Sequence, residues 1–134
     1  MSSAPSSWTI RRKPSFAKDL KRLAKSLYKS DRQREEFLKV LFSFVEVLER
    51  HGPSSPLLDA EVMTGGLAPE GHKLYKFYLR PPHTRGASGQ MRVLALVNET
   101  DQTVDLLMAY THADYPKQPH PREIRERIEE GGDR

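Results

Sequence analysis

The sequence predicts a single α+β domain in which two helices pack against a β-sheet. Two stretches carry apolar residues at helical spacing, and three later stretches carry the patterns of β-strands. The length of 134 residues provides one hydrophobic core and leaves no room for a second. We therefore expect one folded domain over residues 8–130, between a disordered extension at 1–7 and a disordered tail at 131–134.

The first expected element is a short edge strand. Residues 8–12, Trp-Thr-Ile-Arg-Arg, alternate apolar and polar side chains, as a strand with one buried face does. The residues before it are small and polar and bring too little apolar surface to order themselves. Pro14 and Ser15 follow the strand and mark a break in the chain.

Two amphipathic helices are expected next. Their apolar stripes share the spacing 4, 3, 1, 3 and consist of Phe16, Leu20, Leu23, Ala24 and Leu27 in the first helix and Phe37, Leu41, Phe44, Val45 and Leu48 in the second. Ser30 and Gln33 predict a capping box at the start of the second helix, which ends at Gly52-Pro53. Because the link is short, we expect an antiparallel helical hairpin, and its stripes require a sheet to pack on.

The sheet is expected to be an antiparallel β-meander of three strands. Residues 53–71 contain several prolines and glycines and predict mostly loop. In the first strand, at 73–80, Tyr75, Phe77 and Leu79 share an apolar face that belongs against the helices. The opposite face carries Lys76 among polar and apolar residues, and we expect it to be solvated.

The remaining elements are marked by hydrophobicity and by turn residues. The apolar run at 91–97 predicts a central strand, and 104–110 predicts the last one. A flexible hairpin loop is expected at 81–90, and a short charged helix at 121–130 ends the domain.

Composition and charge narrow the classes of function. The absence of cysteine excludes disulfide scaffolds, cysteine-based metal sites and thiol catalysis. No apolar run reaches the roughly 20 residues of a membrane span, and Met1 to Ser7 lacks the pattern of a signal peptide, so we expect a cytoplasmic protein. Residues 1–50 hold 12 Lys and Arg against 6 Asp and Glu. This excess either solvates the helices or attracts a phosphate-rich or acidic partner.

Cationic and aromatic side chains are expected to gather on the solvated face of the sheet. Lys76 and Arg80 share one face of the first meander strand, Arg92 begins the next strand, and the last strand contributes Tyr110 and His112. Arg85 lies in the loop between the first two of these strands, and Tyr75, Tyr78 and Tyr115 add further aromatic rings. A concave surface of this kind suits a phosphodiester.

Cleavage of RNA without a metal ion requires a base for the 2′-hydroxyl, cations for the phosphoryl oxygens and an acid for the leaving 5′-oxygen. His112 is a candidate for the base or the acid. Arg92 and Lys76 are candidates for holding the phosphate, and a tyrosine can stack on an unpaired base. Each residue also has a plain structural reading, as a surface charge, a surface histidine or a core aromatic. The other histidines lack ligand spacing, so we expect no metal and no cofactor.

Several short stretches resemble the RelE/ParE superfamily of bacterial toxins from toxin–antitoxin pairs. These stretches are Phe16 to Leu23 in the first helix, Gly66-Leu67, Leu74 to Arg80, Met91-Arg92-Val93-Leu94, and Tyr110 to Tyr115 at the end of the last strand. The last of them is similar to the threonine–histidine motif of YafQ-type members. The similarity spans residues 8–130, and its motifs follow the order of the family.

The resemblance implies a RelE-like, microbial RNase-like fold and a ribosome-dependent mRNA endonuclease, or mRNA interferase, that a cognate acidic antitoxin silences. By position, Lys76 and Arg92 match the phosphate-binding cations of the family, and His112 matches the general acid or base of YafQ-type members. Tyr115 falls near the aromatic residue that helps to position the substrate. The implied partners are the antitoxin, the ribosome and mRNA.

Two positions depart from RelE itself. Tyr78 stands where RelE has a second catalytic lysine, and Ala113 lies near the place of another arginine. The sequence therefore fits histidine-using members better than it fits RelE. Two alternatives stay open on the same fold: a ParE-like inhibitor of DNA gyrase, and a member that binds RNA or protein without cleaving it.

Overall fold

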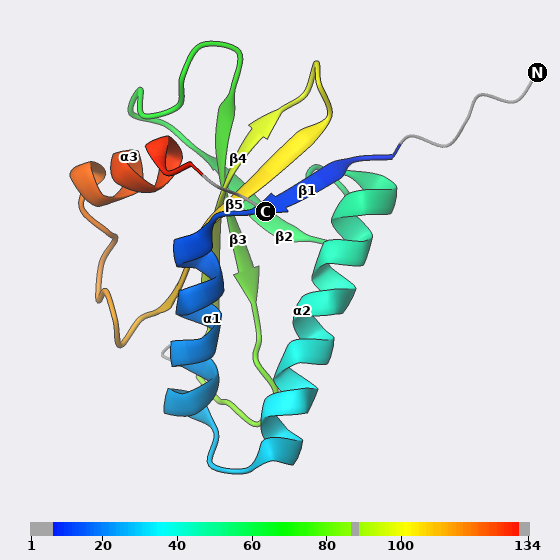
Figure 1. Cartoon of the computed structure of the whole chain (residues 1–134), viewed down its shortest axis with the longest axis vertical. Helices are drawn as coiled ribbons and strands as arrows, with labels where there is room; N and C mark the ends of the chain where they lie inside the picture. Colours follow the sequence, from blue (N-terminus) through cyan, green and yellow to red (C-terminus); the bar gives the residue numbers. More distant parts are fainter. Residues whose placement is uncertain (1–6, 87–88, 132–134) are drawn as a thin grey trace, which may run out of the picture.

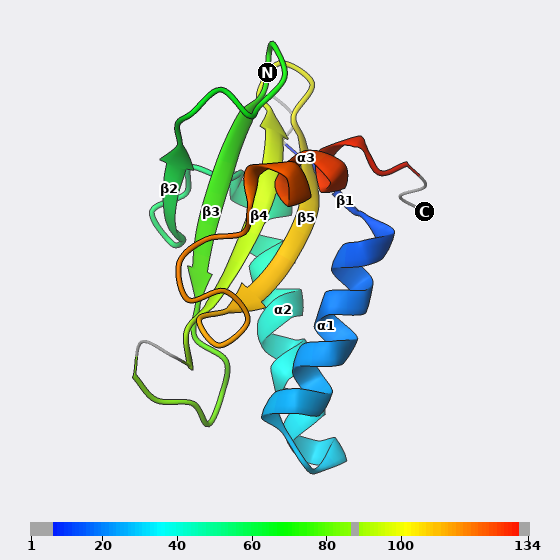
Figure 2. The same cartoon turned by 90° about the vertical axis from the view of Figure 1, so that its left-hand side faces the viewer.

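A computed structural model describes residues 7–86 and 89–131, and its elements form two layers with a short helix added. The helices α1 (Pro14–Leu27) and α2 (Asp31–His51) form a hairpin along one face of a five-stranded sheet (Figure 1). Seen from the side, the sheet separates α1 and α2 from most of α3 (Pro121–Glu129) (Figure 2). The predicted α+β class is confirmed. Most of the expected disordered extension and tail falls outside the described residues, so that expectation stays a prediction.

The sheet has the strand order β1-β5-β4-β3-β2. Its strands are β1 (Thr9–Arg12), β2 (Asp59–Met63), β3 (Lys73–Leu79), β4 (Met91–Asn98) and β5 (Thr103–Thr111). β2 to β5 pair in antiparallel fashion, and β1 lies parallel to β5, so the meander is extended into a mixed sheet. The predicted edge strand and the three meander strands are confirmed, with boundaries that differ by one or two residues.

The strand β2 corrects the expectation that residues 53–71 are mostly loop. Its register with β3 pairs Asp59 with Tyr78 and Met63 with Leu74. As an edge strand it buries little, since Val62 is 48% exposed and its neighbour Ala60 is small. The sequence of β2 therefore shows only a weak alternation of apolar and polar residues. The strand is recognised instead by its backbone pairing with β3.

The ends of the helices agree with the capping residues. The Ser30 hydroxyl accepts a hydrogen bond from the backbone N–H of Gln33 at 3.2 Å, as the capping motif predicts. Gly52 follows α2 with a φ of 81°, and a Cβ at this position would lie 2.7 Å from the indole nitrogen of Trp8. α1 begins at Pro14, two residues before the first residue of its apolar stripe, because proline is favoured in the first turn.

The larger core lies between the helical hairpin and the sheet, as predicted. The helices contribute Phe16, Leu23, Phe37, Leu41, Phe44 and Leu48, and the sheet contributes Tyr75, Phe77, Met91, Val93, Val97 and Val104 among others. The rings of Phe44 and Phe77 meet edge to face with centroids 5.2 Å apart. The alternation in β3 therefore directs its aromatic face to the helices.

A second apolar cluster lies on the opposite face of the sheet and corrects the expectation that this face is solvated. Its buried members are Leu74, Leu94, Leu96, Leu107, Met108, Tyr110 and Ile124. Ile124 and Ile128 belong to α3, whose nine mostly charged residues show only a narrow apolar stripe in the sequence. A register shift between Leu94 and Ala95 leaves Leu107 as an extra residue in β5. α3 thus covers one end of this face and leaves the other end accessible.

Candidate nucleic-acid interface

The accessible end of this face carries three side chains that we call the cationic row: Lys76, Tyr78 and Arg92. Arg92 pairs in register with Tyr78 on β3 and with Tyr110 on β5, so these side chains share a face. The Lys76 ammonium nitrogen lies 6.0 Å from the centroid of the Tyr78 ring, and the Arg92 guanidinium carbon lies 5.9 Å from it. Both cations therefore flank one aromatic ring at cation–π distance.

Hydrogen bonds orient each member of the cationic row. Lys76 donates to the side-chain oxygen of Gln118 at 3.1 Å, and Arg92 donates to the backbone oxygen of Gln90 at 3.1 Å. The Tyr78 hydroxyl donates to a carboxylate oxygen of Glu61 on β2. This bond, with partial burial, raises the pKa of Tyr78 to about 12, so the hydroxyl stays protonated at neutral pH.

Tyr110 lies beside Arg92 but is covered, which corrects its expected place on a solvated face. Its side chain is 1% exposed, and its ring meets the ring of Tyr115 edge to face at 5.4 Å. Burial raises the pKa of Tyr110 to about 12. Its hydroxyl is buried without a hydrogen-bond partner among the described residues. The ring thus presents no free face to a base, because Tyr115 and the apolar cluster that includes Ile124 of α3 pack around it.

The other residues expected at the site lie around the cationic row without joining it. Arg80 is exposed and donates to the backbone oxygen of Gly86 at 2.5 Å, so it braces the loop after β3. Arg85 is exposed in that same loop. Tyr115 is partly buried, and its hydroxyl donates to Glu123. Burial first, and this bond second, raise the pKa of Tyr115 to about 12.

His112 is exposed and follows the last residue of β5. Its neighbour Thr111 pairs with Met91, which directly precedes Arg92. His112 and Arg92 therefore lie at the same end of the sheet. Asp114 anchors the turn that carries His112, since its carboxylate accepts from the backbone N–H of Thr111 at 3.0 Å and from Arg22 of α1 at 2.8 Å.

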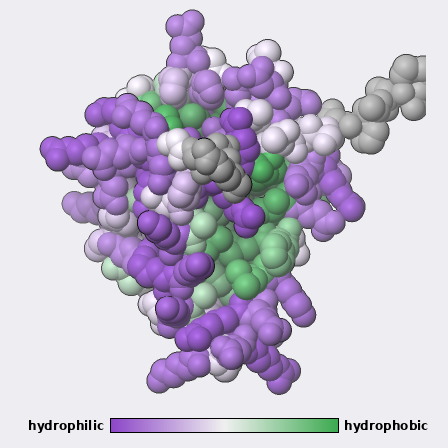
Figure 3. Space-filling view, viewed as in Figure 1, coloured by the Kyte–Doolittle hydropathy of each residue, from purple (hydrophilic) through white to green (hydrophobic). Residues whose placement is uncertain are grey.

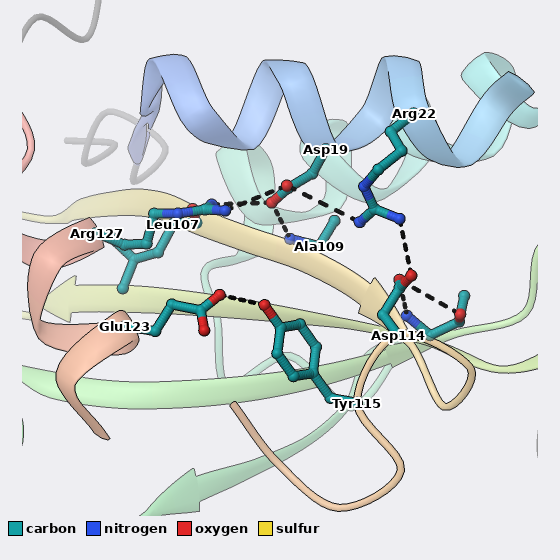
Figure 4. Close-up of polar contacts among 9 residues, drawn as sticks. Asp19, Arg22, Leu107, Ala109, Asp114, Tyr115, Glu123 and Arg127 are labelled. Carbon is teal, nitrogen blue, oxygen red and sulfur yellow. Dashed lines mark hydrogen bonds and ion pairs between the residues drawn. The ribbon is translucent and has the colours of Figure 1, made fainter. Parts of the chain in front are cut away.

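A buried ion pair fixes the elements around this turn (Figure 4). The Asp19 carboxylate of α1 accepts hydrogen bonds from the backbone N–H of Ala109 at 3.0 Å and from both terminal nitrogens of Arg127 at 2.9 and 3.2 Å. Arg127 also donates to the backbone oxygen of Leu107 at 2.8 Å. Burial alone would lower the pKa of Arg127, but the hydrogen bond and charge of Asp19 raise it overall. The pair joins α1, β5 and α3. It also satisfies the backbone oxygen of Leu107 and the backbone N–H of Ala109, which lie past the last β5 residue that pairs with β1.

No pattern in the sequence indicates Glu61 or Gln118 as site residues. Glu61 lies in a segment predicted as loop, and Gln118 lies in the link before α3, more than 40 positions from its partner Lys76. Over residues 7–86 and 89–131, no three histidine or carboxylate side chains gather as a metal ion would require. Within the same ranges, none of the helices has the length and apolar character needed to cross a membrane.

Comparison with known proteins identifies the fold. No protein-family model and no curated protein matches the sequence. A metal-bound toxin from Helicobacter pylori is 21% identical, with 81% of this chain and 98% of that chain covered and a TM-score of 0.52. A copper-bound mutant toxin from the same organism is 18% identical over 81% and 98% of the two chains, with a TM-score of 0.51.

An archaeal RelE–RelB complex from Pyrococcus horikoshii OT3 contains a chain that is 17% identical. The alignment covers 78% of this chain and 94% of that chain, with a TM-score of 0.49. The element order, the sequence motifs and the likeness to the Helicobacter pylori toxin agree. The chain shares the fold of the Helicobacter pylori toxin.

Proposed function

We propose that this chain is the toxin of a toxin–antitoxin pair and cleaves mRNA on the ribosome without a metal ion. The cationic row carries the proposal, because two cations beside an aromatic ring on an accessible sheet face suit a phosphodiester and its neighbouring base. The RelE-like fold and the position of His112 beyond β5 support it. In this proposal the protein acts in the cytoplasm, where it meets ribosomes and mRNA.

The proposed reaction is attack of the 2′-hydroxyl on the adjacent phosphorus. Arg92 and Lys76 bind the phosphoryl oxygens and stabilise the charge that develops on them. His112 takes part in proton transfer as base or acid. Arg80 and Arg85 contact the RNA backbone beside the site, while Tyr115, backed by Tyr110, contributes an aromatic edge.

Mapping of mRNA 5′ ends in bacteria tests the nuclease. We expect inducible expression of the wild type to arrest growth and to produce new 5′ ends within translated codons. His112→Ala is expected to remove these ends, because one proton-transfer group is lost. Lys117→Ala changes an exposed residue in the link before α3 and serves as the control.

Other results would assign the alternatives. Growth arrest with intact messages, together with a DNA-damage response, would favour a ParE-like inhibitor of gyrase. If expression causes no growth arrest and no cleavage, the remaining alternative is a member of this fold that binds RNA or protein without cutting it. If His112→Ala cleaves mRNA as the wild type does, His112 takes no part in the reaction.

The proposed antitoxin is an acidic protein with an amphipathic segment, and the groove between α1 and α2 suits it. Apolar side chains gather in this groove and are bordered by polar ones (Figure 3). Phe42 is 66% exposed and Leu38 is 42% exposed there. The exposed charges of α1 are all cationic and are Lys18, Lys21, Arg22 and Lys25. An acidic segment with one apolar face complements both properties.

Phe42→Asp tests the groove, because it places a carboxylate where an apolar face would dock. We expect the variant to stay toxic and to escape neutralisation when the toxin is coexpressed with an acidic protein from the neighbouring gene. Ser43→Asp, which adds the same charge beside Phe42, is the matched control and is expected to remain neutralised. Full neutralisation of Phe42→Asp would place the antitoxin elsewhere on the surface.

A further inference from the structure

We propose that the buried hydroxyl of Tyr110 donates a hydrogen bond to a phosphoryl oxygen of RNA bound at the cationic row. The inference rests on the proposed function for the identity of the ligand, and it adds an uncharged donor to the two cations. The Tyr110 side chain is 1% exposed, and its hydroxyl has no hydrogen-bond partner within residues 7–86 and 89–131. A buried hydroxyl without a partner costs free energy, so its presence here indicates a ligand.

The hydroxyl of Tyr110 points toward the cationic row. Tyr110 pairs in register with Arg92 on β4, so the two side chains lie side by side on one face of the sheet. Burial raises the pKa of Tyr110 to about 12, while the charge of Arg92 lowers it and that of Glu61 raises it. Tyr110 in turn raises the pKa of Tyr78. Because these neighbours lie on β4, β2 and β3, the hydroxyl reaches from β5 across the sheet toward them.

A phosphoryl oxygen is the partner that this position lacks. The guanidinium of Arg92 carries only donors, so it cannot accept the proton of the Tyr110 hydroxyl. The Tyr78 hydroxyl already donates to Oε1 of Glu61. A phosphate bound by Arg92 brings acceptor oxygens to the same place. Because its pKa is about 12, the Tyr110 hydroxyl keeps its proton at neutral pH and can donate it.

The link between β5 and α3 controls access to the hydroxyl. Tyr115 of this link packs edge to face against the Tyr110 ring, with centroids 5.4 Å apart. Three residues later, Gln118 accepts from Lys76 at 3.1 Å, and the link runs along the same face of the sheet (Figure 2). A lysine ammonium bonds more strongly to an anionic phosphate than to a neutral amide. In this proposal, RNA displaces Gln118 from Lys76, and the freed link uncovers the hydroxyl.

Binding of single-stranded RNA to the purified full chain tests the inference. The probe is a short fluorescent 2′-O-methyl RNA, which cannot be cleaved through its 2′-oxygen, and the readout is fluorescence anisotropy. We expect Tyr110→Phe to weaken binding about tenfold, because the ring stays but one hydrogen bond to a charged oxygen is lost. Gln118→Ala is expected to bind about threefold more tightly, because Lys76 no longer has to leave an internal partner.

The salt dependence of binding separates a direct contact from a disturbance of Arg92. The slope of the logarithm of the binding constant against the logarithm of the salt concentration reports how many phosphate charges are neutralised. Arg92→Ala is expected to reduce this slope by about 0.7. Tyr110→Phe removes no charge and is expected to keep the wild-type slope. A reduced slope in Tyr110→Phe would show that the hydroxyl acts by holding Arg92, and would overturn the direct contact.

Thermal unfolding gives an independent readout. Tyr110→Phe is expected to unfold at the same temperature as the wild type or higher, because it removes an unpaired buried hydroxyl. Tyr28→Phe is the matched control. Tyr28 is 2% exposed in the core on the other face of the sheet, and its hydroxyl donates to the backbone oxygen of Pro82 at 2.6 Å. This variant is expected to unfold at a lower temperature and to bind RNA as the wild type does.

The outcomes separate this inference from the proposed function. RNA binding that weakens in Tyr110→Phe, without new mRNA 5′ ends in cells, would support the inference and overturn the proposed cleavage. New 5′ ends in cells, with equal RNA affinity of Tyr110→Phe and the wild type, would overturn the inference alone. A wild type that does not bind the probe would also overturn it. A less stable Tyr110→Phe with unchanged affinity would assign the hydroxyl to the fold instead.

Discussion

Arg92→Ala is expected to lower the single-turnover rate of mRNA cleavage by about 100- to 1,000-fold. Arg92 occupies the centre of the site, with Tyr78 on one side and Tyr110 on the other. Its guanidinium is already oriented by the backbone of Gln90, so in the proposed reaction it binds the phosphoryl oxygens without reorganisation. Loss of this preorganised charge removes stabilisation of the transition state more than binding of the substrate.

Arg92→Lys provides an intermediate case. Lysine keeps the charge but cannot offer two parallel donors, so we expect a rate between those of the wild type and the alanine variant. Arg50→Ala, on the exposed surface of α2, is expected to cleave at the wild-type rate. If Arg92→Ala cleaves at the wild-type rate, the cationic row is not the site of the reaction.

Asp19→Ala is expected to lower the free energy of unfolding by about 3 kcal/mol. The Asp19 side chain is only 10% exposed and that of its partner Arg127 is 17% exposed, so removal of the carboxylate leaves a largely buried charge unpaired. The backbone N–H of Ala109 loses its acceptor at the same time. Equilibrium unfolding in urea measures the difference.

An exposed ion pair provides the comparison. Glu46 and Arg50 lie 3.1 Å apart on α2, with more than half of each side chain exposed. Glu46→Ala is therefore expected to change the free energy of unfolding by less than about 0.5 kcal/mol. Arg127→Ala added to Asp19→Ala is expected to cost less than the sum of the two single changes, because both remove one interaction. An additive result would contradict the pairing.

The helices and the main core were predictable because large apolar residues repeat at fixed spacing. The stripes that begin at Phe16 and Phe37 each indicate one buried face, and Tyr75 and Phe77 indicate the sheet surface that receives them. The capping motif at Ser30 and the glycine at 52 mark helix ends through local chemistry alone. These features depend on neighbours within a few residues.

The rest depends on contacts that no local pattern records. β2 exists because β3 lies beside it, and its small or exposed residues show no clear alternation. The sequence predicts that Tyr110 lies on a solvated surface, but α3 packs against it in the folded protein. The bond between Glu61 and Tyr78 joins a segment predicted as loop to a predicted strand. The site was therefore predictable in its cations, but not in its carboxylate or in the burial of its tyrosine.

The parallel pairing of β1 with β5 determines when this protein can complete its fold during synthesis. β1 pairs with Thr103 to Leu106, more than 90 residues later in the chain, and Lys13 donates its backbone N–H to Leu106. A nascent chain that ends before β5 has no partner strand for its own beginning, and the helical hairpin has no complete sheet to cover. High contact order of this kind slows folding. The sheet that carries the cationic row is therefore complete only after β5 has been synthesised.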